Sequence, residues 1–203
     1  MNREFVKGFR LEEKRPGEND YRWVVDKMHK TIHPQSNVSR YDIVKVSKIL
    51  NSKTWQPYKE RRSKMYYELG NKYTVEKRLF HCSPEALTIG NDGFDLKFAR
   101  SSGLFGAGIY FAEHSSKSNN YSFGLGKGCG AHNNSKCSQC ERVMLVCKIA
   151  MGKTHETNST GTKLPQGCHS LHFTSPNRES EIIIYDEAQV YPSYIVKYKA
   201  HFK

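Results

Sequence analysis

A glycine-rich stretch that runs into an apolar segment constrains this chain more than any other feature of its sequence. Three glycines fall within residues 103–108, and residues 109–112 are all apolar or aromatic. Glycine allows a backbone to adopt positive φ or to approach a partner closely, and a short apolar run is typical of a buried strand. The pattern therefore predicts a loop that leads directly into a buried strand.

Serines and tyrosines surround this strand. Ser115, Ser116 and Ser118 are candidate N-caps for a helical turn, and Tyr110 and Tyr121 are two aromatic residues that a fold can bring face to face. Such an arrangement is able to hold a flat ring. Glycines beside a strand more often mark a turn or bulge, so the pattern alone leaves both interpretations open. The spacing matches neither a P-loop nor a Rossmann fingerprint.

Three motifs resemble those of poly(ADP-ribose) polymerase catalytic domains. Phe105-Gly-Ala-Gly-Ile-Tyr-Phe-Ala112 with Ser116-Lys-Ser-Asn-Asn-Tyr121 is similar to the NAD-binding signature of that family. Leu79-Phe80-His81-Cys82-Ser83 looks like its His-Gly-Ser motif, and residues 180–186 look like the strand that carries its glutamate. The resemblance implies an α+β, ADP-ribosyltransferase-type fold, with two packed, mainly antiparallel sheets and few helices.

Length and charge set broad limits. A chain of 203 residues is expected to form one large domain, or a domain with a short extension, and is long enough to bury roughly 70% of its unfolded surface. We assign residues 37–203 to the catalytic domain and residues 1–36 to a lead-in and helix of the same domain. No apolar run approaches the length of a membrane span and no signal peptide is visible, so we expect an intracellular protein of the cytoplasm, the nucleus or both.

The chain is strongly basic, which suits anionic partners. Its 32 lysines and arginines exceed its 20 acidic residues and give a net charge of +12. Only residues 59–64 are dense enough in basic side chains to suggest a patch, and a solvated helix face explains them more simply than a nuclear signal. The charge suits nucleic acid, acidic proteins or an anionic polymer product, and it does not choose among them.

Periodicity and turn residues predict mixed elements. Residues 1–20 read as an irregular or extended lead-in, and residues 91–93 and 94–102 as a turn and a loop. Helices are predicted over residues 21–32, 53–69 and 85–89. Strands are predicted over residues 40–50, 78–81, 143–151, 169–173, 181–185 and 194–198.

One loop carries a metal-ligand pattern. Cys129, His132, Cys137 and Cys140 form C-x2-H-x4-C-x2-C, which offers three thiolates and an imidazole to a tetrahedral Zn²⁺. Four protein ligands leave no position for a catalytic water, so we expect a structural zinc in a loop over residues 129–140. The other three of the six cysteines are scattered, which favours metal binding in a reducing compartment over disulfides.

This loop resembles the zinc-binding insertion of the tankyrases within that family. Tyr191-Pro-Ser-Tyr194 is also tankyrase-like, and the resemblance extends over about residues 37–200. Phe98 and Arg100 stand where tankyrases carry histidine and tyrosine in the loop that meets the adenosine end of NAD. Contacts at that end are therefore in doubt. The family also implies protein acceptors and poly(ADP-ribose) chains as partners.

The resemblance implies a role for each site residue. Glu181, His81 and Tyr110 would form the catalytic set, with His81 on a ribose hydroxyl of NAD and Glu181 stabilising the oxocarbenium-like transition state. Tyr110 and Tyr121 would sandwich the nicotinamide. The carboxamide would be held by the main chain of residue 82 and the hydroxyl of Ser118, and Ser83 completes the NAD-binding set.

One departure weakens the resemblance. Cys82 replaces the family's glycine after the histidine, so we expect weaker binding of NAD than with glycine. Glu181 is what elongation requires in the family, and its presence is necessary but not sufficient for it. Three functions therefore stay open: a poly(ADP-ribose)-forming transferase, a transferase of single ADP-ribose units, or a zinc-stabilised basic binding module with a spoiled transferase site.

Overall fold

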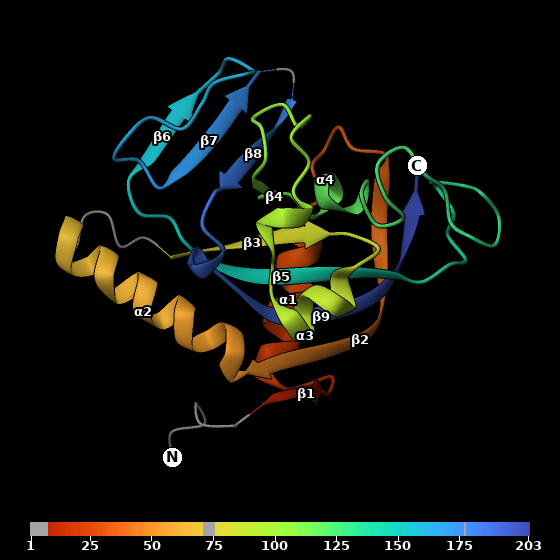
Figure 1. Ribbon diagram of the computed structural model, residues 1–203. Helices are drawn as coiled ribbons and strands as arrows, with labels where there is room; N and C mark the ends of the chain where they lie inside the picture. The colour runs from red at the N-terminus through yellow and green to blue at the C-terminus, as the bar shows by residue number, and fades with distance from the viewer. Residues whose placement is uncertain (1–7, 71–75, 177) are drawn as a thin grey trace.

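Two β-sheets that meet at β3 and β4 form the centre of the molecule (Figure 1). The computed structural model describes residues 8–70, 76–176 and 178–203. The larger sheet has the strand order β1-β2-β9-β5-β3 and is antiparallel throughout. Its strands are β1 (Phe9–Lys14), β2 (Val38–Asn51), β3 (Glu76–Cys82), β5 (Arg142–Ala150) and β9 (Val190–Phe202).

The smaller sheet has the order β4-β8-β7-β6, and only its β6–β7 pair is parallel. Its strands are β4 (Ile109–Phe111), β6 (Thr154–Thr157), β7 (Ser170–Ser175) and β8 (Arg178–Ile184). The main chains of Phe80 and Ala112 exchange hydrogen bonds of 2.9 and 3.0 Å, and so join β3 to the end of β4. The predicted α+β fold of two mainly antiparallel sheets is confirmed.

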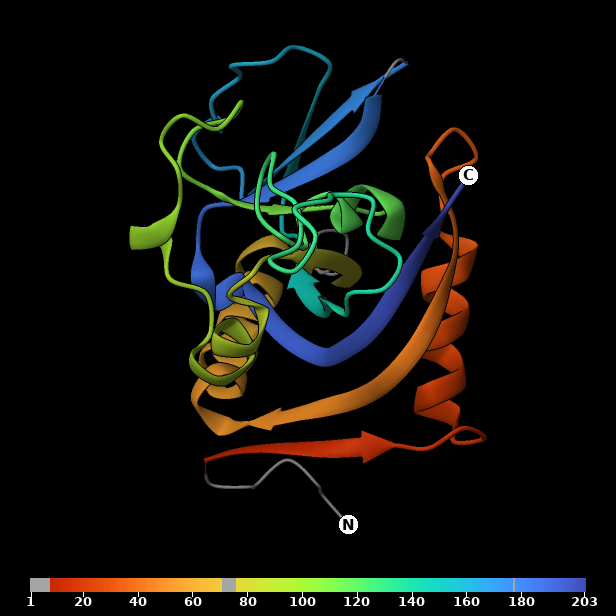
Figure 2. The same ribbon diagram turned by 90° about the vertical axis from the view of Figure 1, so that its right-hand side faces the viewer.

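Helices are few and lie around the sheets. In Figure 2, α1 stands beside β2, on the side of the larger sheet away from α3. No helix within the described ranges is long and apolar enough to cross a membrane. The α-helices are α1 (Asn19–Lys30), α2 (Ser52–Leu69), α3 (Ala86–Asp92) and α4 (Ser115–Asn119), and the 3-10 turns are η2 (Leu96–Phe98) and η3 (Glu187–Gln189).

The hydrophobic core has two main parts, one on each face of the larger sheet. Val24 and Met28 of α1 pack against Phe80, Val146 and Tyr198 on one face. The other face packs against the smaller sheet through residues that alternate with these along each strand. Among them are Leu79, Leu145, Ile149, Ile182 and Ile184, all at most 2% exposed. Period-two alternation therefore assigns each strand residue to a face.

The structure differs from the prediction in several places. The lead-in over residues 1–20 contains β1, whose Phe9 and Leu11 are exposed because it is an edge strand. Asn91 and Asp92 end α3 instead of forming a turn, and Gly93 terminates the helix at φ +90°. The prediction also missed β6. The predicted 194–198 strand is part of the longer β9, because Pro192 is accommodated where β5 and β9 shift register.

Candidate active site

The glycine-rich loop fixes the ring of Tyr110. A Cβ atom at Gly108 would overlap the Cγ2 methyl of Ile183, and one at Gly103 would overlap the Tyr110 hydroxyl. The hydroxyl of Tyr110 accepts a hydrogen bond from the Phe105 N–H at 2.8 Å and donates one to the Gly106 carbonyl at 3.0 Å. The glycines are therefore needed for close approach of the loop to both β4 and β8.

His81 lies near the end of β3 beside β4. Its Nδ1 is 2.9 Å from the carbonyl oxygen of Tyr110, and its ring packs edge-on against Phe94 at 5.0 Å. Burial lowers the pKa of His81, and the hydrogen bond to Tyr110 opposes that shift. Since a carbonyl only accepts, Nδ1 carries the proton of a neutral ring. Nε2 is thereby left as an acceptor.

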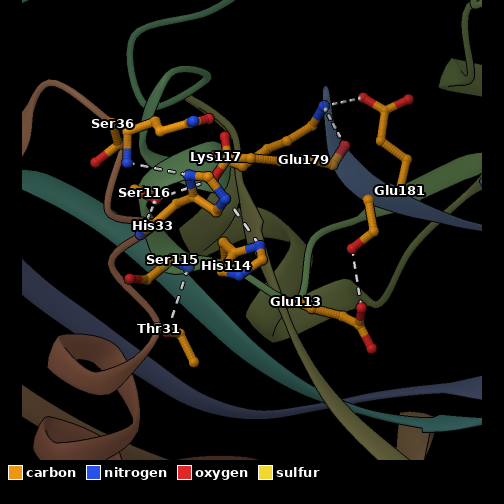
Figure 3. A network of polar contacts seen from close by, with 12 residues as sticks. Thr31, His33, Ser36, Glu113, His114, Ser115, Ser116, Lys117, Glu179 and Glu181 are labelled. Carbon is orange, nitrogen blue, oxygen red and sulfur yellow. Dashed lines mark hydrogen bonds and ion pairs between the residues drawn. The ribbon is translucent and has the colours of Figure 1, made fainter. Parts of the chain in front are cut away.

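Glu181 is a buried carboxylate in the middle of β8. It is 8% exposed, and its Oε1 lies 2.8 Å from Nζ of Lys117, which also donates to the main-chain oxygen of Glu179 at 3.3 Å (Figure 3). Burial raises the pKa of Tyr110 and of Tyr121, and the charge of Glu181 raises both further. Glu181 is therefore close to both tyrosines. Across the described residues, the two tyrosine rings make no contact with each other.

Helix α4, which carries Lys117 and Ser118, is fastened to the end of α1. The N–H of Ser115 donates to the carbonyl of Thr31 at 3.1 Å, and its hydroxyl donates to the carbonyl of Met28 at 2.6 Å. The hydroxyl of Ser116 accepts from the His33 N–H at 3.0 Å and donates to Glu179 at 3.1 Å (Figure 3).

The prediction that these serines cap α4 was wrong. The N-cap is His114, whose side chain makes no capping hydrogen bond. Ser115, Ser116 and Ser118 lie inside the helix and are at most 4% exposed. Their hydroxyls face other elements because α4 is buried between α1 and β8, where main-chain carbonyls and a carboxylate need donors.

Cys82 points into the core. Its sulfur lies 3.7 Å from the hydroxyl of Tyr198, which donates to Oδ1 of Asn119 at 2.9 Å. Burial raises the pKa of Cys82 to about 12, although the hydroxyls of Tyr198, Ser122 and Ser118 favour the thiolate. The thiol is therefore neutral and packs close to Ser118. Whether it weakens NAD binding stays a prediction.

Three predicted binding residues lie apart from this group. The hydroxyl of Ser83 accepts from the Glu85 N–H at 3.1 Å, which fixes the turn that leads into α3. Phe98 is 85% exposed in η2, and Arg100 lies on the surface after it. In the described ranges, no hydrogen bond, ion pair or ring contact joins Phe98 or Arg100 to His81, Tyr110 or Glu181.

Sequence reasoning missed a group that braces β4 against β8. Glu113 bonds Lys77 at 2.9 Å and Ser180 at 2.9 Å, and it lies 3.6 Å from His172, which also contacts Glu156 at 2.7 Å. Lys117 was missed as well, although it lies inside the quoted motif. The antiparallel pairing of β4 with β8 was the available signal, since it places residues after Phe111 beside residues before Ile182.

The four metal-ligand candidates converge in the loop before β5. Nδ1 of His132 lies 3.6, 3.4 and 3.5 Å from the sulfurs of Cys129, Cys137 and Cys140. All four ligand atoms lie within 4.8 Å of one another. A tetrahedral zinc with Zn–S bonds of ~2.3 Å and a Zn–N bond of ~2.0 Å requires S···N separations of roughly 3.5 Å. The donor set therefore fits such an ion.

The pKa values of the cysteines and the hydrogen bonds that anchor the loop are both consistent with a bound cation. Hydrogen bonding with the Asn134 backbone lowers the pKa of Cys129 to about 6, whereas hydrogen bonding with Cys129 raises the pKa of Cys140 to about 11. A cation would relieve this crowding of thiolates. The buried guanidinium of Arg142 donates to the carbonyls of Ser135 and Cys137, both at 2.9 Å, and so ties the loop to β5.

These groups define what the site can do. Two tyrosines whose pKa values the charge of Glu181 raises provide aromatic surface for a flat ring, and a neutral histidine provides an acceptor for a hydroxyl. A buried carboxylate held by a lysine stabilises positive charge that develops on a bound sugar. The structure brings His81 and Tyr110 together where the two sheets meet, and the charge of Glu181 on β8 acts on both Tyr110 and Tyr121.

Comparison with known proteins places this geometry in a family. The model of the poly(ADP-ribose) polymerase catalytic domain matches residues 18–177. A probable poly(ADP-ribose) polymerase of Dictyostelium discoideum is 26% identical over 189 residues, which are 90% of this chain and 50% of that protein. Human protein mono-ADP-ribosyltransferase PARP12 is 23% identical over 80% of this chain and 23% of its own length.

A poly(ADP-ribose) polymerase of Sarcophaga peregrina is 28% identical over 82% of this chain and 15% of its own length. The chain thus spans half or less of the length of these relatives. Glu181 lies beyond the residues that the family model matches.

Proposed function

This chain belongs to the family of poly(ADP-ribose) polymerase catalytic domains, and on that premise we propose that it is an NAD-dependent protein ADP-ribosyltransferase that builds poly(ADP-ribose). The observation that carries the proposal is the position of Glu181. Its carboxylate is buried, held by Lys117 at 2.8 Å, and close to Tyr110 and Tyr121. The family match supports NAD as the substrate.

Each residue then has a role in the reaction. The nicotinamide ring of NAD lies between Tyr110 and Tyr121, with its carboxamide at Ser118 and the main chain of Cys82. Nε2 of His81 accepts a hydrogen bond from a ribose hydroxyl, because Nδ1 is committed to the carbonyl of Tyr110. These contacts orient the bond between the nicotinamide nitrogen and C1′ of the ribose.

Glu181 acts at the reacting carbon. The C1′–N bond breaks, the nicotinamide leaves with the electron pair, and the sugar gains positive charge that the carboxylate stabilises more than it stabilises the neutral sugar. An acceptor hydroxyl or carboxylate oxygen then bonds to C1′. Where the acceptor is a hydroxyl, its proton passes to Glu181.

We propose a zinc-containing, tankyrase-like form of the domain. The convergence of Cys129, His132, Cys137 and Cys140 supports a structural ion, which would order a loop that has little core of its own. Free thiolates in such a cluster require a reducing compartment, which supports an intracellular location in the cytoplasm, the nucleus or both. Its partners would be protein acceptors and poly(ADP-ribose) chains.

The test is NAD turnover with labelled ADP-ribose, run on the wild type beside Glu181→Gln, with products resolved by size. We expect a long smear in the wild type and a loss of roughly 10²–10³-fold in turnover in the variant, because the amide no longer stabilises the cationic transition state. A single-unit product in the wild type would favour the activity in the name of PARP12. No turnover at all would favour a binding module and contradict the proposal.

A further inference from the structure

Four cations lie over aromatic rings on the face of the larger sheet that α1 covers. Each pair joins a lysine or arginine to a ring from another element, at distances typical of cation–π contact. The pairs are Lys27 over Phe80 at 5.3 Å, Lys48 over Tyr194 at 5.9 Å, Arg78 over Trp23 at 4.8 Å and Lys148 over Trp55 at 5.1 Å.

These pairs form one continuous surface. Arg78 of β3 is the direct partner of Lys148 of β5, and Lys48 of β2 is the partner of Tyr194 of β9. Trp23 of α1 carries the Arg78 end of this strand pair and Trp55 of α2 carries the Lys148 end. We call this surface the cation–aromatic face. It consists of Lys27, Lys48, Arg62, Arg78 and Lys148 together with Trp23, Trp55, Phe80 and Tyr194.

Positive charge on this face is not balanced. Glu76 lies 3.9 Å from both Arg62 and Arg78, and Asp20 lies 2.9 Å from Lys48. Within the described ranges, no carboxylate comes within ion-pair distance of Lys27 or Lys148. Glu113 attracts Lys27 from beyond ion-pair distance, so three carboxylates in all face five cations.

The direction in which the pKa of Lys148 is shifted is consistent with this excess of positive charge. Burial lowers the pKa of Lys148, and repulsion from Arg78, Arg62 and Lys48 lowers it further against the attraction of Glu76. Burial likewise lowers the pKa of Lys27, with repulsion from Arg78 adding to the shift and attraction from Glu113 opposing it. An anion bound here would relieve mutual repulsion among side chains that are already held in place by aromatic rings.

The flat groups of the face favour a nucleotide polymer over an acidic peptide. The guanidinium of Arg78 lies over Trp23 on one side and its side chain is 37% exposed, so its plane offers a stacking surface for a base. Trp23 is itself 37% exposed. Phe80 and Tyr194 are buried, so Trp23 and the partly exposed Trp55 are the rings that a base can reach. Cations beside accessible aromatic rings are the combination that binds single strands without sequence preference.

We propose that the cation–aromatic face binds single-stranded RNA, with its cations on successive phosphates and a base stacked on Arg78. The face is separate from the transferase site. Arg78 and Phe80 point to one side of β3, whereas His81 points to the other. RNA binding is therefore an additional property of the domain that does not depend on its catalysis.

The experiment measures binding of the whole chain to a labelled 12-nucleotide RNA against salt concentration. Five phosphate contacts predict a slope of log K against log salt of about −3.5, or roughly 100-fold weaker binding when salt rises from about 50 to 200 mM. In Arg78→Gln/Lys148→Gln the slope should become shallower by about 1.4. A second pair, Lys27→Gln/Lys48→Gln, should give the same change.

The matched control is Lys153→Gln/Lys163→Gln, which removes two exposed lysines beside β6 of the other sheet. Melting temperature shows that each variant is folded. An unchanged slope in both face variants, or an equal change in the control, overturns the proposal. Binding of polyglutamate as tight as that of RNA also overturns it. So does binding of poly(ADP-ribose) without RNA, since the face would then be a site for the product.

Discussion

The line where the two sheets meet and the loop before β5 both gather reactive side chains, but they are held by different means. His81, Tyr110 and Glu181 are fixed by strand pairing, by core on both sides and by main-chain hydrogen bonds. Cys129 and His132 belong to a loop that has no regular element between α4 and β5. In Figure 1 this loop projects at the right, near the C-terminus.

The difference shows which site is formed by folding alone. The candidate site built on strands is in place before any ligand binds, so under the proposed function binding free energy would be available for the transition state. The arrangement of the loop before β5 depends instead on four metal-ligand side chains that converge on one point. Hydrogen bonds from Arg142 of β5 link this loop to the rest of the fold. A metal would therefore contribute mostly to the loop and little to the strands.

The largest expected effect comes from breaking the metal cluster. In Cys137→Ser, or after strong chelation, the chain should lose one bound zinc and hydrogen exchange should rise through residues 124–141, because metal binding contributes roughly 10–16 kcal/mol in comparable sites. NAD turnover should fall by less than tenfold. Metal analysis measures the loss of zinc, and amide exchange measures the change in protection over residues 124–141. A collapse of turnover together with zinc loss would show that the regions are not independent.

The next prediction tests whether Lys117 holds the carboxylate of Glu181 in position. In Lys117→Met we expect turnover to fall roughly 100-fold, about 2.7 kcal/mol, because Glu181 loses the cation that orients it. The matched control is Lys77→Met. It removes a lysine from the partly exposed Glu113 and should change turnover less than threefold. Steady-state rates at saturating NAD measure both, and equal losses would contradict a specific role for Lys117.

A pair of glycine substitutions compares the two regions directly. Gly108→Ala should destabilise the fold by about 1–3 kcal/mol, because the new methyl overlaps Ile183 in a packed sheet. Gly130→Ala in the metal loop meets nothing within 4 Å and should change stability by less than about 0.5 kcal/mol. Denaturant unfolding measures both. Similar losses would mean that the loop is packed as tightly as the strands.

The smallest expected effect is a pH dependence of folding stability, which arises from Glu113 and His172 beside the paired strands. Hydrogen bonding with His172 holds the pKa of Glu113 below its ordinary 4.5, so this contribution to stability is present above about pH 4.5 and is lost as the pH falls. Glu113 raises the pKa of His172 above its ordinary 6.5, so that contribution is full below about pH 6.5 and is lost as the pH rises through the folded pKa.

The pair thus stabilises the fold most between about pH 4.5 and 6.5. His172→Gln should flatten the difference between this window and neutral pH. Chemical unfolding across the pH range provides the measurement, and an unaltered profile would show that other groups cause the dependence.

The resemblance of three motifs to a known family led to the fold class, and strong apolar periodicity led to the longer helices. The helix predicted over residues 21–32 is α1 at Asn19–Lys30, and the one over 53–69 is α2 at Ser52–Leu69. β1 was missed because an edge strand buries little, and its charged residues pair with β2 instead, as Glu13 does with Lys45. No pattern within the sequence marks such a strand.

Site contacts between distant segments were harder to predict. The spacing of Cys129, His132, Cys137 and Cys140 was enough to predict their convergence, since all four lie in one short segment. The bonds of Ser115 and Ser116 to the end of α1, the residues after it and β8 were not, because residues 63 or more apart in the chain meet only after the sheets pack. Local capping rules fail where tertiary contacts offer better acceptors.

The two hydrogen bonds between Phe80 and Ala112 place the candidate site at the junction of the two sheets. His81 belongs to one sheet and Glu181 to the other, so their separation reports the angle at which the sheets meet. Core substitutions that tilt one sheet by a small amount would therefore move His81 relative to Glu181 without replacing either residue.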